Sequence, residues 1–207
     1  MPLSQLLVGQ QNIADGSVVT ARSGRQGESI ISQLHGAYTE QALRRNLFHA
    51  HAIVTAPVIY TTAAGTGGPL LWNPSTSGVN AIILAAGVAV TTVTTVAAGL
   101  GLTGNTGQTS APTSTTAIDS RTNAMVGGAA SACTPYRVGT PTNAGNFFIP
   151  IYWVHTGALT VDNTGIGWQD LQGILVCPPG AWVSLAGSAT ASTTVAQLAL
   201  MWEEVPV

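Results

Sequence analysis

Residues 79–102 read VNAIILAAGVAVTTVTTVAAGLGL, and the structure of this stretch decides the fold class. The stretch is long enough to cross a bilayer as a single helix. Against that interpretation stand the β-branched Val and Thr residues from Val88 to Val96, the interior glycines, and the lack of an Arg or Lys anchor at either end. These features favour two strands joined by a glycine-rich loop, so we expect no membrane segment here.

The charge distribution around this stretch is unusual. No Asp, Glu, Lys or Arg occurs from Asn46 to Ile118, and a charge-free segment of that length must be buried, face a partner or lie in a membrane. Charged residues are 7% of the whole chain while apolar residues are 45%, and every one of the six cations is an arginine. A net charge of −2 without a basic cluster argues against nucleic-acid binding as the main task.

The remaining strands are predicted from β-branched and aromatic runs that end at turn residues. Residues 178–180, Pro-Pro-Gly, predict either a hairpin or a corner between two sheets, and residues 103–146 predict long loops with one or two irregular strands. One helix is predicted, from Glu28 to Leu47, by apolar residues near helical spacing. The predicted strands are His51–Tyr60, Leu70–Trp72, Val79–Ala85, Phe147–His155, Leu171–Cys177, Ala181–Ala186 and Val195–Trp202.

This pattern predicts an all-β fold, an antiparallel β-sandwich of the jelly-roll kind, because no helix separates consecutive strands. Residues 1–45 hold four of the six arginines, and we expect them to form an extended N-terminal arm that carries the single short helix at its junction with the sandwich. Residues 46–207 are then a β domain that oligomerises. The N-terminus lacks the positive and apolar regions of a secretory signal.

No catalytic motif is complete in the sequence. Residues 99–104, GLGLTG, have the spacing of a dinucleotide fingerprint, but the following TGQTSAPTST cannot begin the helix that would hold the pyrophosphate. Asp119, Asp162 and Asp170 are the candidates for glycosidase carboxylates, although scattered acids also serve solubility. Glu203 and Glu204 are adjacent on a terminal strand and should point to opposite faces. We therefore predict a chain without enzymatic activity and without a cofactor.

Three other groups of residues are candidate sites. His49 and His51 would project from one face of a strand, and near a three-fold axis they would offer six imidazoles to a transition metal; the alternative is two exposed histidines without a ligand. Trp168, placed in a loop from Asn163 to Gln169, is the tryptophan best positioned to stack on a sugar. Cys133 and Cys177 are either two buried thiols or one disulfide.

Five segments of the chain resemble structural proteins of tailed bacteriophages, among them head decoration (cement) and head-fibre proteins. They are ARSGRQGESIISQLHGAYTEQ (residues 21–41) with RNLF (45–48), LWNP (71–74) with SG (77–78), and WEEVP (202–206). The resemblance implies a virion protein on the capsid exterior, made in the host cytoplasm, which stabilises the assembled shell of the major capsid protein. It also implies a homotrimer whose arm binds the shell through Arg22, Arg25, Arg44 and Arg45.

Two functions of other classes remain open. A tail-fibre or receptor-binding subunit would use the same fold and would bind glycans or the host surface. A tailspike glycosidase would need a pair of carboxylates in a groove. Binding to phage heads separates the decoration protein from both, and cleavage of polysaccharide identifies the glycosidase.

Overall fold

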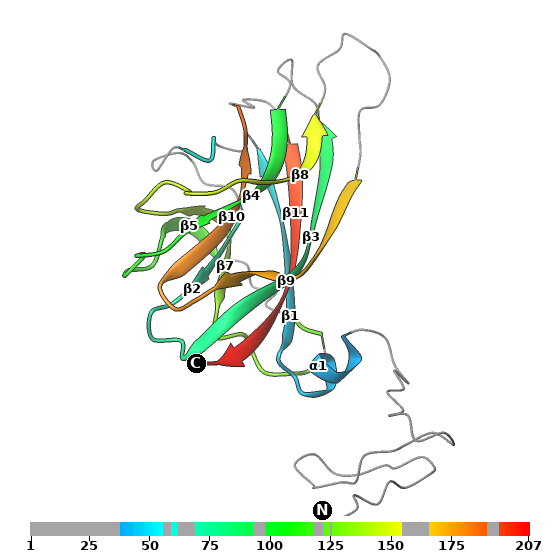
Figure 1. Cartoon of the computed structure of the whole chain (residues 1–207), viewed down its shortest axis with the longest axis vertical. Coiled ribbons are helices and arrows are strands. Elements are labelled where there is room, and N and C mark those ends of the chain that lie inside the picture. Colours follow the sequence, from blue (N-terminus) through cyan, green and yellow to red (C-terminus); the bar gives the residue numbers. More distant parts are fainter. Residues whose placement is uncertain are drawn as a thin grey trace, which may run out of the picture. The chain divides into compact units, whose positions relative to one another are not determined.

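The computed structural model describes residues 38–55, 59–61, 69–92, 98–117, 122–124, 126–154, 166–189 and 195–207. By its internal contacts the chain divides into two compact units, Met1–Thr39 and Glu40–Val207. The second unit is built almost entirely of β-strands, which form two stacked sheets (Figure 1). The predicted division between an arm and a β domain after residue 45 stays a prediction.

The described part of the chain contains one short helix and eleven strands, named here in chain order. They are α1 (Thr39–Leu43), β1 (Leu47–Thr55), β2 (Leu70–Asn73), β3 (Val79–Thr92), β4 (Ala98–Asn105), β5 (Thr113–Ala117), β6 (Thr122–Asn123), β7 (Thr134–Thr140), β8 (Ile149–Val154), β9 (Ile166–Cys177), β10 (Ala181–Gly187) and β11 (Val195–Pro206).

Both sheets are antiparallel, which confirms the predicted all-β sandwich. The five-stranded sheet has the order β6-β1-β11-β3-β9, and the six-stranded sheet has the order β5-β7-β2-β10-β4-β8. From β1 to β4 and again from β8 to β11, each strand lies in the sheet opposite to that of the strand before it. The chain therefore crosses the sandwich at nearly every connection, and strands distant in sequence become neighbours.

The core lies between the two sheets and follows the two-residue period of the strands. On β11 every second side chain from Ala196 to Glu204 is buried, while those between them are partly exposed. At the centre Trp202 is fully buried and stacks on Phe48 of β1, with ring centroids 5.9 Å apart. The alternation of buried and partly exposed residues along β11 therefore indicates a strand, and this strand lies between β1 and β3 in the sheet.

Two tight corners carry the chain between the sheets. Pro178–Gly180 joins β9 to β10, so the structure selects the sheet corner over the hairpin, and Gly180 has the positive φ (79°) that such a turn requires. The other corner joins β2 to β3. The buried Asn73 side chain ties the two corners together by donating from Nδ2 to the Val79 and Cys177 carbonyl oxygens, at 2.8 Å each.

Residues 79–102 form two strands, as predicted, but the boundary between them differs. β3 continues through Gly87 to Thr92, and Gly99 and Gly101 lie inside β4 instead of in a loop. In the described residues no helix has the length and apolar character needed to cross a membrane. The glycines are accommodated in strands because neighbouring strands or aromatic rings occupy the space that a side chain would need.

The predicted helix Glu28–Leu47 is wrong at its C-terminal end. Helix α1 ends at Leu43, Arg45 adopts a left-handed conformation (φ 64°), and Leu47 already begins a strand. A residue in this conformation terminates a helix, and the buried Phe48 then follows the strand period. Residues 28–37 lie outside the described part of the chain.

Several strand boundaries also differ from the predicted ones. β1 begins four residues before the predicted His51, and β9 begins five residues before the predicted Leu171. The region 103–146 contains the end of β4 and the strands β5, β6 and β7, where one or two irregular strands were expected. β5 fits that expectation, since its register with β7 shifts twice, whereas β7 is a regular seven-residue strand.

Candidate interaction surface

The side of the five-stranded sheet that points away from the core is the most unusual surface of the sandwich. Its rows of cross-strand neighbours follow from the register, for example His51, Ala199, Gly87 and Trp168 across β1, β11, β3 and β9. We call this surface the outer face. Its residues are Ile53, Ile82, Ala85, Gly87, Ala89, Ile166, Trp168, Ile174, Val176, Ala199, Met201 and Val205, with His49, His51, Asn80, Asp170, Gln197 and Glu203.

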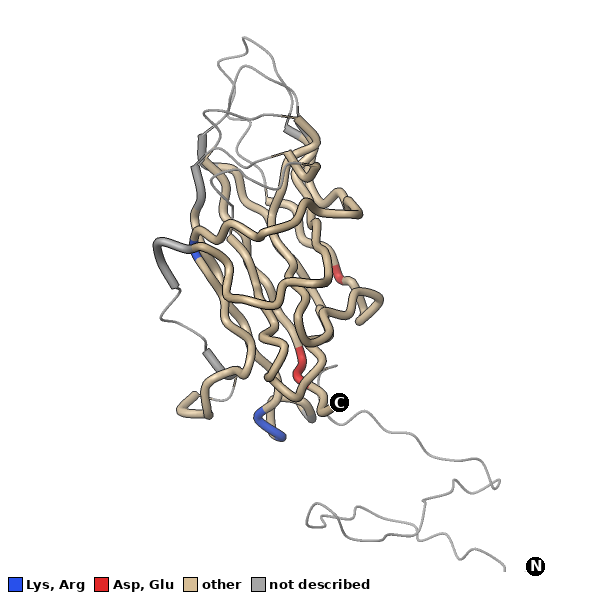
Figure 2. The backbone as a smooth tube through the Cα atoms, turned by 90° about the vertical axis from the view of Figure 1, so that its left-hand side faces the viewer, with Lys and Arg blue, Asp and Glu red and all other residues tan. Residues whose placement is uncertain are grey.

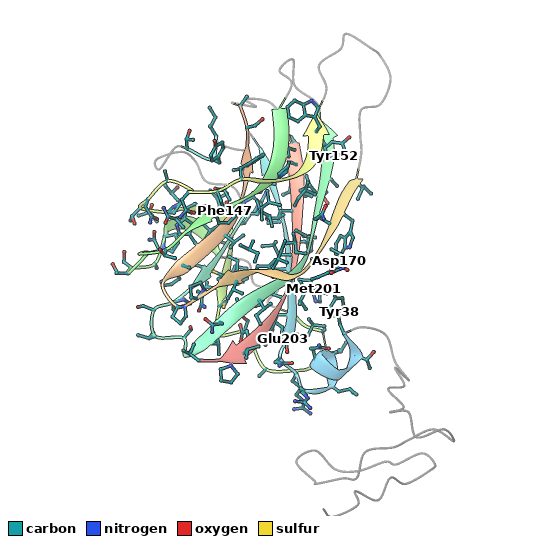
Figure 3. The ribbon with its side chains drawn as sticks, viewed as in Figure 1. Tyr38, Phe147, Tyr152, Asp170, Met201 and Glu203 are labelled. Atoms are coloured by element: carbon teal, nitrogen blue, oxygen red, sulfur yellow. The ribbon has the colours of Figure 1, made fainter. Side chains whose placement is uncertain are left out.

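Apolar residues dominate the outer face and several of them are exposed. Ile166, Ile174 and Trp168 on β9 are 81%, 78% and 60% exposed. Asp170 and Glu203 are its acids, and both are labelled in Figure 3. Figure 2 shows how few charged positions the whole sandwich carries. An exposed apolar sheet face at the edge of a sheet is typical of an interaction surface.

Trp168 lies in strand β9, so its predicted position in a loop is wrong; residues 163–165 lie outside the described residues. Its six-membered ring covers Gly87 of β3, where an added Cβ would lie 2.6 Å from Cε3 and 2.9 Å from Cζ3. The ring is thus held against the sheet while its other side faces outward. A residue with a side chain at position 87 would collide with the Trp168 ring in this position.

A second exposed tryptophan has the same arrangement on the other sheet. Trp153 of β8 is 59% exposed and lies over Gly99 of β4, with Cε3 and Cζ3 both 3.1 Å from the position of an added Cβ. The other three tryptophans have structural contacts. Trp182 donates to Asn143, Trp72 approaches the Gln108 carbonyl, and Trp202 lies in the core.

His49 and His51 are both exposed and project from the outer face of β1, as their spacing predicts. Met201 of β11 lies beside His49 and Ala199 beside His51. Within the described ranges no group of three His, Cys, Asp or Glu side chains is arranged to hold a metal ion. The metal site between three copies therefore stays a prediction. His35 and His155 lie outside the described residues.

Glu203 and Glu204 point to opposite sides of β11, as predicted. The Glu203 carboxylate accepts a hydrogen bond of 3.1 Å from the Asn46 amide on the outer face. The buried Glu204 carboxylate accepts from the Ser131 hydroxyl, from the backbone N–H groups of Ala132 and Cys133 at 3.1 Å each, and from the Trp202 indole at 3.4 Å. Glu204 therefore fixes the segment before β7 and is structural.

The two cysteines are buried free thiols. Burial raises the pKa of the Cys177 thiol to about 12, and a hydrogen bond with the backbone of Asn73 opposes that shift. Burial also raises the pKa of Cys133, and the nearby Glu204 carboxylate raises it further. Both thiols are protonated at neutral pH, which suits core residues and not nucleophiles.

The arginines predicted to bind a partner are only partly within the described residues. Arg44 and Arg45 are exposed in the turn between α1 and β1, and Arg22 and Arg25 lie outside the described residues. Arg137 of β7, which was not singled out, reaches the edge of β1 and donates from Nε to the Ile53 carbonyl at 3.4 Å. The structure thus places one cation beside the outer face.

The candidate glycosidase carboxylates are not brought together. Asp170 is exposed on β9, while Asp119 and Asp162 lie outside the described residues.

A narrow pocket opens between β1 and β7, and its lining is apolar apart from His51 and Tyr136. Gly99–Gly104, the segment with dinucleotide-fingerprint spacing, lies within strand β4.

The feature that sequence reasoning missed is the apolar outer side of β9. Ile166, Trp168, Ile174 and Val176 all point outward, and the signal for this strand was weak because its inward positions include Gly167 and Gln169. Comparison of the chain with protein-family models, with curated proteins and with solved structures gave no match.

Proposed function

We propose that this chain is a non-enzymatic structural subunit of a tailed-phage virion, a decoration protein that binds and stabilises the assembled capsid shell. The observation that carries the proposal is the outer face, which exposes Ile166, Trp168 and Ile174 on a sandwich with very few charges. A protein that works as a monomer usually exposes only small apolar patches and carries many charged residues on its surface. A subunit that is covered by neighbours in an assembly does not need to.

The topology supports the jelly-roll assignment. Strands β1, β11, β3 and β9 form one four-stranded group, and β2, β10, β4 and β8 form the other, with β5, β6 and β7 added at the edges. Eight strands that alternate between two sheets in this way are typical of jelly rolls, which include viral capsid and lectin domains. This support is an analogy of fold, and the phage assignment itself rests on the resemblance of residues 21–48, 71–78 and 202–206.

In this proposal the N-terminal arm docks on the major capsid protein and the sandwich forms a homotrimer on the outside of the shell. Arg22, Arg25, Arg44 and Arg45 would form charge-assisted contacts with carboxylates of the capsid. Because the protein would bind the assembled shell and not its separated subunits, each bound copy would stabilise the assembled state by linkage.

Co-sedimentation with purified, protein-stripped phage heads tests this proposal. The full-length chain should pellet with the heads, and the double variant Arg44→Glu, Arg45→Glu should lose most of that binding. Ala111→Glu is the matched control, since it places the same carboxylate at another exposed loop position of the sandwich. A wild-type chain that stays in the supernatant at every concentration would contradict the decoration role.

One observation favours a second candidate, a receptor-binding subunit of the phage tail. Trp153 presents a flat, fixed aromatic surface over Gly99, and such surfaces stack on sugar rings. A glycan array with the wild type and Trp153→Ala tests it, with tryptophan-dependent binding expected of a receptor-binding subunit. Release of reducing ends from a bound polysaccharide would identify a tailspike glycosidase instead.

A further inference from the structure

The outer face has the size of a protein interface. Its four long strands are β1, β11, β3 and β9, and the shortest of them, β1, has nine residues. With strands spaced about 4.8 Å apart and a rise of about 3.4 Å per residue, the face measures roughly 600 Å² before side-chain relief is added. A stable interface buries about 800 Å² on each partner. A single apolar partner of similar width would therefore cover it.

The charges around the face suit a second copy of the same chain. Asp170 lies on β9 at one edge of the sheet, and Arg137 lies beside Ile53 of β1 at the other edge. When copies are arranged head to tail, the β9 edge of one meets the β1 edge of the next, and the two opposite charges approach each other. Ala199 and Met201, in the middle of the face, are apolar and can lie against a neighbouring copy.

Trp168 has the properties of an anchor for this contact. Large, well-packed aromatic side chains contribute a major part of the binding energy of many interfaces. Because Gly87 lets the ring lie against the sheet, the side chain loses little conformational freedom when a partner covers it. Within the described residues no strand pairs with the outer edge of β9, which is a further reason for association. The strand exposes Ile174, and the sequence places no lysine or proline between residues 166 and 177.

We propose that the outer face is the surface through which copies of this chain associate, with Trp168 as its anchor and the β9 edge of one copy next to the β1 edge of another. This inference names the surface for the self-association proposed above and rests on it. It does not depend on the capsid as the partner.

The test uses full-length protein and compares two tryptophans of equal exposure. Trp168→Arg changes the outer face, and Trp153→Arg changes the exposed face of the other sheet at a residue that also lies over a glycine. Molar mass is measured by light scattering over a hundredfold range of concentration, and far-UV circular dichroism checks that each variant is folded. Ala199→Arg serves as a second variant of the outer face in case Trp168→Arg does not fold.

We expect Trp168→Arg and Ala199→Arg to raise the concentration at which the oligomer dissociates at least tenfold, while Trp153→Arg leaves it unchanged. An oligomer that survives both outer-face substitutions would overturn the assignment of the surface and leave the proposed self-association standing. A wild type that is a monomer throughout would overturn both. Dissociation caused by Trp153→Arg alone would place the interface on the other sheet and would also overturn the inference.

Discussion

Gly101 of β4 offers a sharp test of how the edge of the six-stranded sheet is built. A Cβ added at Gly101 would overlap the Ile149 carbonyl oxygen and would lie 2.8 Å from the Ile149 carbonyl carbon and 2.9 Å from Pro150 Cα. These are backbone atoms of β8, so Gly101→Ala must push the two strands apart. At Gly99, two residues earlier on the same strand, the atoms nearest to the added Cβ would be side-chain atoms, the Trp153 ring at 3.1 Å and Ser188 Oγ at 3.4 Å, which need to shift by only a few tenths of an ångström.

The size of the effect follows from the contacts between β4 and β8 that would be lost. The register pairs Gly101 with Pro150 and Leu102 with Ile149, and each lost ladder hydrogen bond costs about 1 kcal/mol. Loss of the packing of the partly buried Ile149 adds about 1 kcal/mol. Gly101→Ala should therefore lower the free energy of unfolding by about 2–3 kcal/mol. For a protein of this length that corresponds to a fall in Tm of about 4–12 °C.

The assay is urea unfolding followed by tryptophan fluorescence, with thermal melting as a second readout at the same protein concentration. Gly99→Ala is the control, with an expected change below about 0.5 kcal/mol. A Gly101→Ala variant as stable as the wild type, or a Gly99→Ala variant that loses as much, would refute the close approach of β4 and β8.

Four further predictions concern buried groups and the edges of the sheet. Glu204→Gln should lower the free energy of unfolding by about 2–3 kcal/mol in urea unfolding, because an amide nitrogen would replace one carboxylate oxygen that accepts buried hydrogen bonds; an unchanged midpoint would contradict this. Cys133 and Cys177 should resist a thiol reagent at pH 8 until the protein unfolds. Because their folded pKa values are raised, stability should be full below the unfolded thiol pKa of about 8.5 and should fall as the pH rises toward 12. Arg137→Glu and Asp170→Arg should each weaken self-association in light scattering, and the double variant should restore it if the two edges meet; additive loss would argue against that contact.

The sequence predicts the fold class well because β-branched, apolar and aromatic runs end at turn residues, and because one strand alternates strictly between buried and partly exposed residues. In β11 every second residue from Ala196 to Trp202 is apolar and buried, which indicates a strand with one face in the core. Residues 178–180, Pro-Pro-Gly, predict a turn, while the choice between a hairpin and a sheet corner comes from the structure.

Other features depend on tertiary contacts that a single sequence does not reveal. The first half of β9 has Gly167 and Gln169 at its inward positions, and Gly167 lies against the Ile151 carbonyl of β8, where a Cβ would be 2.9 Å from the oxygen. In this half the strand pairs with β3 and approaches β8 closely, and its inward positions do not follow an apolar alternation. For the same reason Trp168 was predicted in a loop, and the outer face became visible only when the register aligned β9 with β3.

The candidate partner-binding residues show the same limit. Arg44 and Arg45 were singled out because arginines are concentrated before residue 46, and the structure places them in an exposed turn. Arg137 was overlooked because it stands alone in sequence, and only the fold brings it to the edge of β1.

The most direct test of the central claim is the molar mass of the purified full-length chain by light scattering, with and without the substitution Trp168→Arg. The account predicts a wild-type mass three times the 21.0 kDa of one chain, and a Trp168→Arg variant that is folded but dissociates at a concentration at least tenfold higher. A wild type that remains a monomer at every concentration would contradict an assembly subunit built around the outer face.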